Sequence, residues 1–111
     1  MDSELIKGTL SLLILSLLSR RPMYGYELVF TVRQETDSAF EWKAGSLYPS
    51  LHNLEKHGLV SSEWKGEPGQ RQRKYYLLTE AGKTVLTEKR DTWTTMVWAV
   101  NTILENSHGQ D

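Results

Sequence analysis

The segment 45-GSLYPSLHNLEK-56 decides the fold of this chain. Its three leucines recur at i, i+4 and i+7, a spacing that places them on one face of a helix and predicts that this face is in the core. Proline lacks an N–H and fits the first turn of a helix, so Pro49 predicts a start near Ser46 as the N-cap. Gly58 predicts a left-handed cap at the other end.

The face opposite the leucines carries small or hydrogen-bonding side chains and one cation, which suits contact with DNA. Asn53 has the two groups needed for a bidentate contact with adenine, and Ser46 or Ser50 can hold a phosphate. Ser46 is equally suited to be only an N-cap. The candidate recognition residues are Ser46, Tyr48, Pro49, Ser50, His52, Asn53 and Lys56.

Two helices are expected before this segment. The first covers about residues 4–19 and is apolar over most of its circumference, which predicts burial on most sides, including under a second surface. Pro22 is expected in the first turn of the second helix, where a missing N–H costs least. Gly25 within that helix predicts close packing or a close backbone approach.

A β-hairpin and a long helix are expected after the segment. Residues 59–65 and 73–78 favour strands, and residues 66–70 between them form the predicted flexible tip. Thr79 predicts the N-cap of a last helix that reaches about Glu105. The aromatic residues expected to be packed are Trp42, Trp64, Tyr75 and Tyr76.

Apolar residues of this last helix recur with a heptad-like spacing over roughly three heptads. Nothing else in 111 residues is left to cover them, so we expect a homodimer. Trp98 lies off the pattern, and we expect it to cover the first helix of the partner. The residues assigned to the dimer are Leu86, Trp93, Met96, Val97, Val100, Ile103 and Leu104.

The order helix, helix, helix, hairpin is that of a winged helix-turn-helix. We therefore expect a mainly α fold with a β-hairpin. A winged helix-turn-helix DNA-binding domain is expected over residues 1–78, and a long C-terminal dimerisation helix with a short tail over residues 79–111.

Charge is unevenly distributed along the chain, although the formal net charge is only −1. Residues 43–74 contain six cations and three anions, a net of +3, which leaves −4 for the remainder. Such a chain can hold a polyanion on one face. Strand alternation is expected to turn Lys74 away from the face used by Arg73. The candidate phosphate contacts are Lys43, Lys65, Arg71, Arg73 and Lys74.

Composition excludes several classes of protein. With 39% apolar and 24% charged residues, the chain is expected to form one globular domain. The absence of cysteine excludes disulfides and thiolate zinc sites, and the apolar run at 9–18 is too short to cross a bilayer, so we expect a cytoplasmic protein. His52 and His57 are about 140° apart around a helix, so their side chains converge poorly on a metal ion. We expect no catalytic residue, metal site or cofactor, and no enzyme.

Four ordered blocks resemble the PadR family of bacterial transcriptional regulators. They are 8-GTL-10 with 22-PMYGYEL-28, 45-GSLYPSL-51, 54-LEKHGLV-60 and 73-RKYYLLTEAG-82, and the resemblance covers about residues 5–105. It implies a winged-helix dimer, joined mainly through the last helix, that represses transcription from a palindromic operator. The single last helix resembles the small subgroup of the family.

The resemblance also implies roles for individual residues. Some members of the small subgroup bind aromatic or planar cationic drugs in a pore at the dimer centre, where a tryptophan stacks on the ligand. Trp93 stands at the matching position, with Met96 one turn later, although Trp93 is equally suited to packing in the dimer. Matching tyrosines imply that Tyr24 and Tyr48 donate hydroxyls to phosphate, with packing as the alternative for Tyr24.

The expected function is therefore that of a sequence-specific DNA-binding regulator. We expect a repressor that binds a palindromic operator in double-stranded DNA as a homodimer, is released by a small hydrophobic, aromatic or planar cationic effector, and has no membrane partner. The alternative is a dimeric small-molecule-binding or protein-interaction module without an operator, against which the basic hairpin argues.

Overall fold

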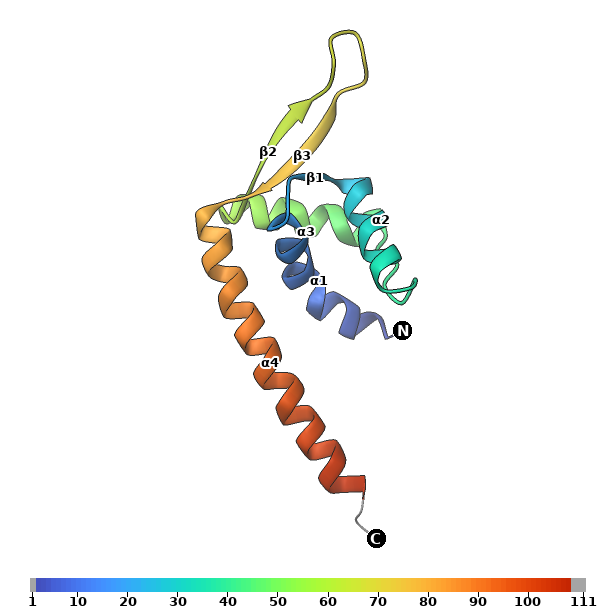
Figure 1. Cartoon of the computed structure of the whole chain (residues 1–111), viewed down its shortest axis with the longest axis vertical. Helices are drawn as coiled ribbons and strands as arrows, with labels where there is room; N and C mark the ends of the chain where they lie inside the picture. The colour runs from blue at the N-terminus through green and yellow to red at the C-terminus, as the bar shows by residue number, and fades with distance from the viewer. Residues whose placement is uncertain (1, 109–111) are drawn as a thin grey trace.

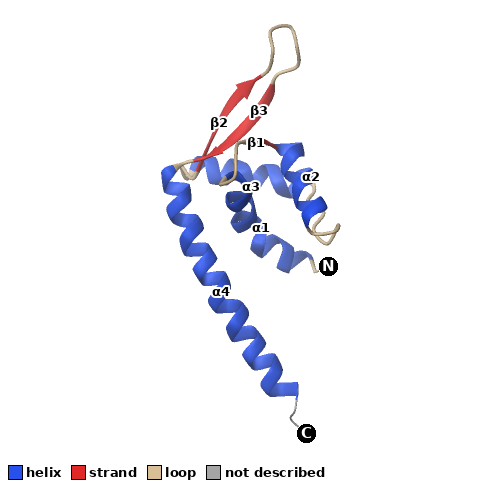
Figure 2. Cartoon of the chain, in the orientation of Figure 1, coloured by secondary structure: helices blue, strands red, loops and turns tan. Residues whose placement is uncertain are grey.

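A computed structural model describes residues 2–108, and it confirms a mainly α fold with a winged helix-turn-helix and a long C-terminal helix (Figure 2). The hairpin and the outer part of the last helix project from opposite ends of the body (Figure 1), and the chain measures 68 × 28 × 21 Å. The elements are α1 (Ser3–Leu18), β1 (Met23–Tyr24), α2 (Gly25–Glu35), α3 (Ala44–Lys56), β2 (Val60–Lys65), β3 (Arg73–Leu78) and α4 (Glu80–His108).

The core forms where α1, α3 and the sheet meet. Ile14 and Leu15 of α1 are completely buried, as are Leu47 and Leu51 of α3, so the leucine face of α3 is in the core as predicted. Trp42 is also buried, which confirms its packing role. Within residues 2–108, none of the helices combines the length and the apolar character that crossing a bilayer requires.

The sheet is antiparallel, in the order β1-β3-β2, and its first strand was not predicted. Met23 lies opposite Tyr76 in β3, which holds the chain extended just after Pro22. The predicted helix start at Pro22 was therefore wrong, and α2 begins at Gly25. The close approach predicted at Gly25 is confirmed, because a Cβ there would lie 2.7 Å from Cζ of Tyr48.

Helix α3 begins earlier than predicted, with Lys43 as its N-cap. The N–H groups of Ser46 and Leu47 donate to the Lys43 carbonyl at 3.0 and 2.9 Å, so Ser46 is inside the helix and is not its N-cap. Pro49 likewise lies beyond the first turn. It is tolerated there because it is exposed and only one backbone bond, to the carbonyl of Gly45, is lost.

The C-terminal end of α3 is as predicted. Gly58 adopts a φ of 73°, in the left-handed region. Its N–H donates to the Glu55 carbonyl at 3.0 Å, and the N–H of Leu59 donates to the Leu54 carbonyl at 2.9 Å. These two bonds form a Schellman motif, which satisfies the last carbonyls of the helix and directs the chain into β2.

The hairpin has a longer loop than predicted, spanning residues 66–72. Val60 and Tyr76 are on the face of the hairpin that packs on the body, and each is only 2% exposed. Trp64 shares this face by strand alternation, yet it is 66% exposed. Its exposure shows that its predicted place in the hairpin core was wrong. The outer ends of both strands project beyond the helices (Figure 1).

The hairpin formed by β2, β3 and the loop between them is called the wing below. Thr79 joins the wing to α4. Its hydroxyl accepts from the N–H of Gly82 at 3.0 Å, which confirms the predicted N-cap, and donates to the Gly58 carbonyl at 2.7 Å. A Cβ on Gly82 would lie 2.6 Å from Cδ1 of Leu78 and closer still to the Leu59 carbonyl oxygen. Only glycine therefore allows α4 to start so close to the backbone that follows α3.

The first turns of α4 pack against α1. Leu86 is 5% exposed and belongs to the core of its own chain, so its assignment to the dimer is corrected: this side chain has almost no surface left for a partner. The other apolar residues assigned to the dimer lie farther along α4 and are exposed: Trp93, Met96, Val97, Val100, Ile103 and Leu104. Helix α4 continues to His108, beyond its predicted end near Glu105, so residues 106–108 of the predicted tail are helical and the rest of the tail lies outside the described residues.

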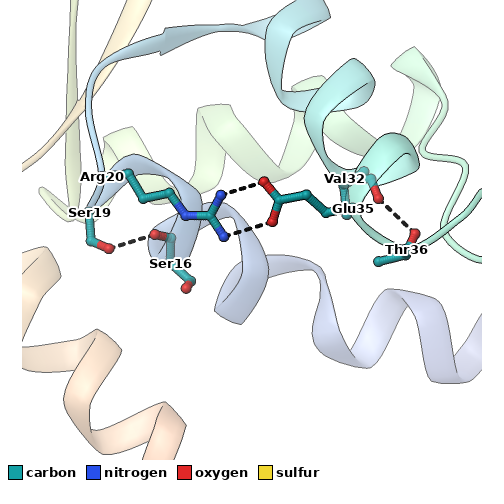
Figure 3. Close-up of polar contacts among 6 residues, drawn as sticks. All are labelled: Ser16, Ser19, Arg20, Val32, Glu35 and Thr36. Carbon is teal, nitrogen blue, oxygen red and sulfur yellow. Dashed lines mark hydrogen bonds and ion pairs between the residues drawn. The ribbon is translucent and has the colours of Figure 1, made fainter.

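Two consecutive arginines fix α2 to the end of α1. The guanidinium of Arg20 donates to both carboxylate oxygens of Glu35 at 2.5 and 2.9 Å (Figure 3), and Arg21 pairs with Glu27 near the other end of α2. The hydrogen bond from Arg20 lowers the pKa of Glu35 below its ordinary value. Directly after α2, the hydroxyl of Thr36 donates to the Val32 carbonyl at 2.7 Å (Figure 3).

Candidate nucleic-acid interface

An open groove runs between α3, the start of α2 and the wing, with a volume of about 710 Å³. We call it the wing groove. It brings together predicted residues from three parts of the sequence that meet only in the fold. Its lining residues are Tyr24, Gly25, Tyr26, Tyr48, His52, Trp64, Arg71, Gln72, Arg73, Lys74 and Tyr76.

Arg73 is held in place by aromatic side chains at one side of this groove. Its guanidinium carbon lies 4.6 Å from the ring centroid of Tyr24, and Nη1 donates to the Tyr24 hydroxyl at 3.2 Å. The Tyr24 ring in turn meets Tyr75 edge to face, with centroids 5.4 Å apart. Because its oxygen accepts from Arg73, the Tyr24 hydroxyl can direct its own hydrogen to an anion.

Tyr48 and His52 form the wall contributed by α3. They are one helical turn apart and line the same groove. The Tyr48 ring lies against the backbone of Gly25, at the first residue of α2, and the side chain is 41% exposed. The glycine thus lets the hydroxyl of Tyr48 approach the N-terminal end of a helix, where an anion is favoured.

Lys74 is directed toward α3 rather than toward Arg73. Its Nζ lies 3.8 Å from a carboxylate oxygen of Glu55 and 5.5 Å from the ring centroid of Tyr76. Glu55 also accepts from the Ser62 hydroxyl at 2.5 Å, so it connects the helix to both wing strands. Burial first, and then the charge of Glu55, raise the pKa of Tyr76. The expected separation of Lys74 from the face used by Arg73 agrees with these contacts.

The other predicted DNA contacts lie outside the wing groove. Pro49, Asn53 and Lys56 are exposed on α3, with Ser46 and Ser50 half-buried beside them and Lys43 exposed at the N-cap. Lys65 is in the wing, where its Nζ pairs with Glu63 at 3.0 Å. Sequence reasoning missed Trp64, Gln72 and Tyr26 as groove residues. Strand and helix periodicity predict the face on which a side chain lies, but they do not show whether other elements of the fold cover that face.

A second, smaller cavity of about 350 Å³ lies between α1 and α4. It brings together Trp93 and Met96, the two predicted effector contacts. Glu88 and Lys89 add a carboxylate and an ammonium group, so the site combines aromatic, apolar and oppositely charged groups. The lining residues are Gly8, Leu12, Val85, Glu88, Lys89, Thr92, Trp93 and Met96.

Comparisons with known proteins agree with this architecture. Residues 14–88 match the Transcriptional regulator PadR-like family. A transcriptional regulator from Clostridium thermocellum has a similar structure, with a TM-score of 0.85 and 31% identity, covering 92% of this chain and 96% of that one.

A PadR family transcriptional regulator from Eggerthella lenta is 41% identical, with a TM-score of 0.80 over 92% of this chain and 87% of that one. Transcriptional regulator YqjI of Escherichia coli is 34% identical over 84 residues, which are 76% of this chain and 39% of that protein. The chain therefore belongs to the PadR family and is a transcriptional regulator, not an enzyme.

Proposed function

We propose that this regulator is a repressor that binds a palindromic operator as a homodimer and is released by a small aromatic or planar cationic effector. The observation that carries the proposal is the wing groove, in which α3 and the wing present cations and hydroxyls on one side of the body. A duplex that receives α3 in its major groove would reach the wing with its backbone or minor groove.

Each predicted contact has a proposed role in that arrangement. Asn53 reads a base, because it is exposed in the last turn of α3 and carries a donor and an acceptor. Tyr24, Tyr48, Arg71 and Arg73 contact phosphates, and Lys74 does so more weakly because it already pairs with Glu55. The remaining proposed contacts are Lys43, Ser46, Pro49, Ser50, His52, Lys56 and Lys65.

Selection of bound duplexes from a random DNA pool tests operator binding. The proposal predicts an inverted repeat whose half-sites are separated by about one helical turn, ~34 Å, or a multiple of it. Recovery of unrelated sequences, or of a single half-site, would contradict a palindromic operator. The repressor role rests on the resemblance to the family. A reporter gene placed behind the selected operator tests whether the protein lowers or raises transcription.

The homodimer is supported by apolar side chains that the single chain leaves open. From Trp93 to Leu104, the outer part of α4 exposes a row of apolar residues, and the exposure of so much apolar surface to water is unfavourable. A second copy can cover this row, and Trp98, which is 69% exposed, is proposed to cover α1 of the partner. Light scattering at micromolar concentration tests the dimer, and the mass of a monomer would contradict it.

Effector binding is supported by the cavity between α1 and α4. Trp93 offers a ring for stacking, and Glu88 offers a charge for a cationic ligand. We expect planar aromatic cations to quench Trp93 fluorescence and to weaken operator binding. Trp93→Phe is the control, since it removes the reporter but keeps an apolar ring. An operator affinity that no member of a ligand panel changes would leave Trp93 as a packing residue.

A further inference from the structure

We propose that Trp64 is a DNA contact, in which the indole ring packs against the sugar-phosphate backbone of a duplex held in the wing groove. This inference rests on the proposed operator binding and adds an uncharged contact to it. The position of the ring, the charges around it and the opposite wall of the groove support it.

The position of Trp64 is unusual for a tryptophan. It lies on the same face of the hairpin as Val60 and Tyr76, which are almost completely buried, yet Trp64 itself is 66% exposed. Only Glu63 separates it from Ser62, whose hydroxyl still bonds to Glu55 of α3. The ring therefore faces the α3 side of the wing but lies beyond the part of the core that could cover it.

The surroundings of the ring are cationic. Lys74 is the cross-strand neighbour of Trp64 on the same face of the hairpin. Arg71 and Arg73 line the same groove. Across residues 63–74 the wing carries four cations and two anions, so a partner that covers Trp64 must tolerate or prefer positive charge.

The opposite wall narrows the choice of partner to nucleic acid. Tyr48 and His52 of α3 face the groove that Trp64 closes from the wing, so an occupant would touch hydrogen-bonding groups on one side and an aromatic ring on the other. A duplex offers phosphates for the cations and the apolar faces of its deoxyribose rings for the indole. Trp64 supplies contact area without charge.

The absence of charge gives a test that separates Trp64 from the basic residues around it. Trp64→Ala should weaken binding to the selected duplex about 10-fold at every salt concentration, with an unchanged slope of log K against log salt. Arg71→Ala is the matched control from the same groove, and it should reduce the magnitude of that slope by about 1.8, because a dimer loses two phosphate contacts. Because the ring is exposed, Trp64→Ala should keep the thermal unfolding midpoint of the parent.

Either equal affinity of Trp64→Ala and the parent, or a change in slope like that of Arg71→Ala, would overturn the inference. Failure of the parent to bind any duplex would instead refute the proposed function, and the Trp64 contact with it. The two failures are therefore distinguishable.

Fluorescence quenching by acrylamide tests the contact itself. Duplex should shield part of the tryptophan emission of the parent, and this shielding should be largely absent in Trp64→Phe. Equal shielding in both proteins would show that DNA does not cover Trp64 and would overturn the inference. Trp64 already shielded in the free protein would also overturn it, because another part of the dimer would then occupy its place.

Discussion

The wing groove and the outer part of α4 are both exposed, but they differ in chemistry. The groove presents cations, hydroxyls and one indole within the segment whose net charge is +3. The outer part of α4 presents Trp98, Ile103 and Leu104, each more than 60% exposed, and among residues 93–108 only Glu105 carries a formal charge with histidine neutral. The difference matches the two partners that we propose: a polyanion for the groove and the α4 of a second copy for the apolar row.

The largest effect should come from a charge placed on the apolar row of α4. Val100→Asp would bury a carboxylate in the proposed dimer, where an unpaired charge costs several kcal/mol, so the dimer should weaken at least ~100-fold. Light scattering over a concentration series measures this. Thr95→Asp is the control, since it adds the same charge to the same helix off the row. Equal dimerisation of the two variants would break the comparison.

The next effect concerns the junction between the two regions. Gly82→Ala should lower the free energy of unfolding by about 1–3 kcal/mol, because the new Cβ meets the Leu59 carbonyl and Leu78. Gly45→Ala is the matched control in α3, where nothing lies within 4 Å of the new atom. Urea unfolding of both variants measures the difference. A Gly82→Ala protein as stable as Gly45→Ala would show that the junction can move.

Within the DNA-binding region, Asn53 should act on specificity. Asn53→Ala is expected to reduce discrimination by about 1–3 kcal/mol at one base position of each half-site, because a bidentate contact is lost. Binding to a set of duplexes with single substitutions measures this effect. If the loss is the same for every duplex, Asn53 positions the helix and does not read a base.

The smallest effect should come from the ion pair that fixes α2 to α1. Since Arg20 lowers the pKa of Glu35, the pair stabilises the fold at neutral pH, and this stabilisation is lost as the pH falls through the lowered pKa. Glu35→Gln should therefore be slightly less stable than the parent at pH 7, and the two should become equally stable once the pH falls below the lowered pKa of Glu35. Thermal unfolding against pH measures this, with exposed Glu41→Gln as the control. A difference in stability between Glu35→Gln and the parent that persists in acid would show that it does not arise from the ion pair.

The sequence was sufficient for the features that depend on neighbouring residues. The leucine face of α3, the left-handed cap at Gly58 and the N-cap at Thr79 were all predicted, because each follows from a local pattern. The family and the winged-helix fold followed from the order of these features. Two helix starts were misplaced by local rules, since a backbone carbonyl at Lys43 and a strand pairing at Met23 set them instead.

The remaining wrong predictions concern the burial of side chains near the edge of the core. Heptad spacing assigned Leu86 to the dimer together with Trp93, but α1 covers only the earlier of these positions. Strand alternation likewise placed Trp64 on the inner face of the hairpin, which is correct, without showing that the core stops before it. Periodicity gives the direction of a side chain, whereas its burial depends on contacts distant in the sequence.

The salt dependence of operator affinity shows whether the cationic groove binds duplex DNA as part of a dimer. If each chain neutralises ~3–5 phosphates, a dimer neutralises ~6–10, and log K plotted against log salt should have a slope between about −5 and −9. A flat profile would contradict the account, because the charges of the groove would then contribute nothing to binding.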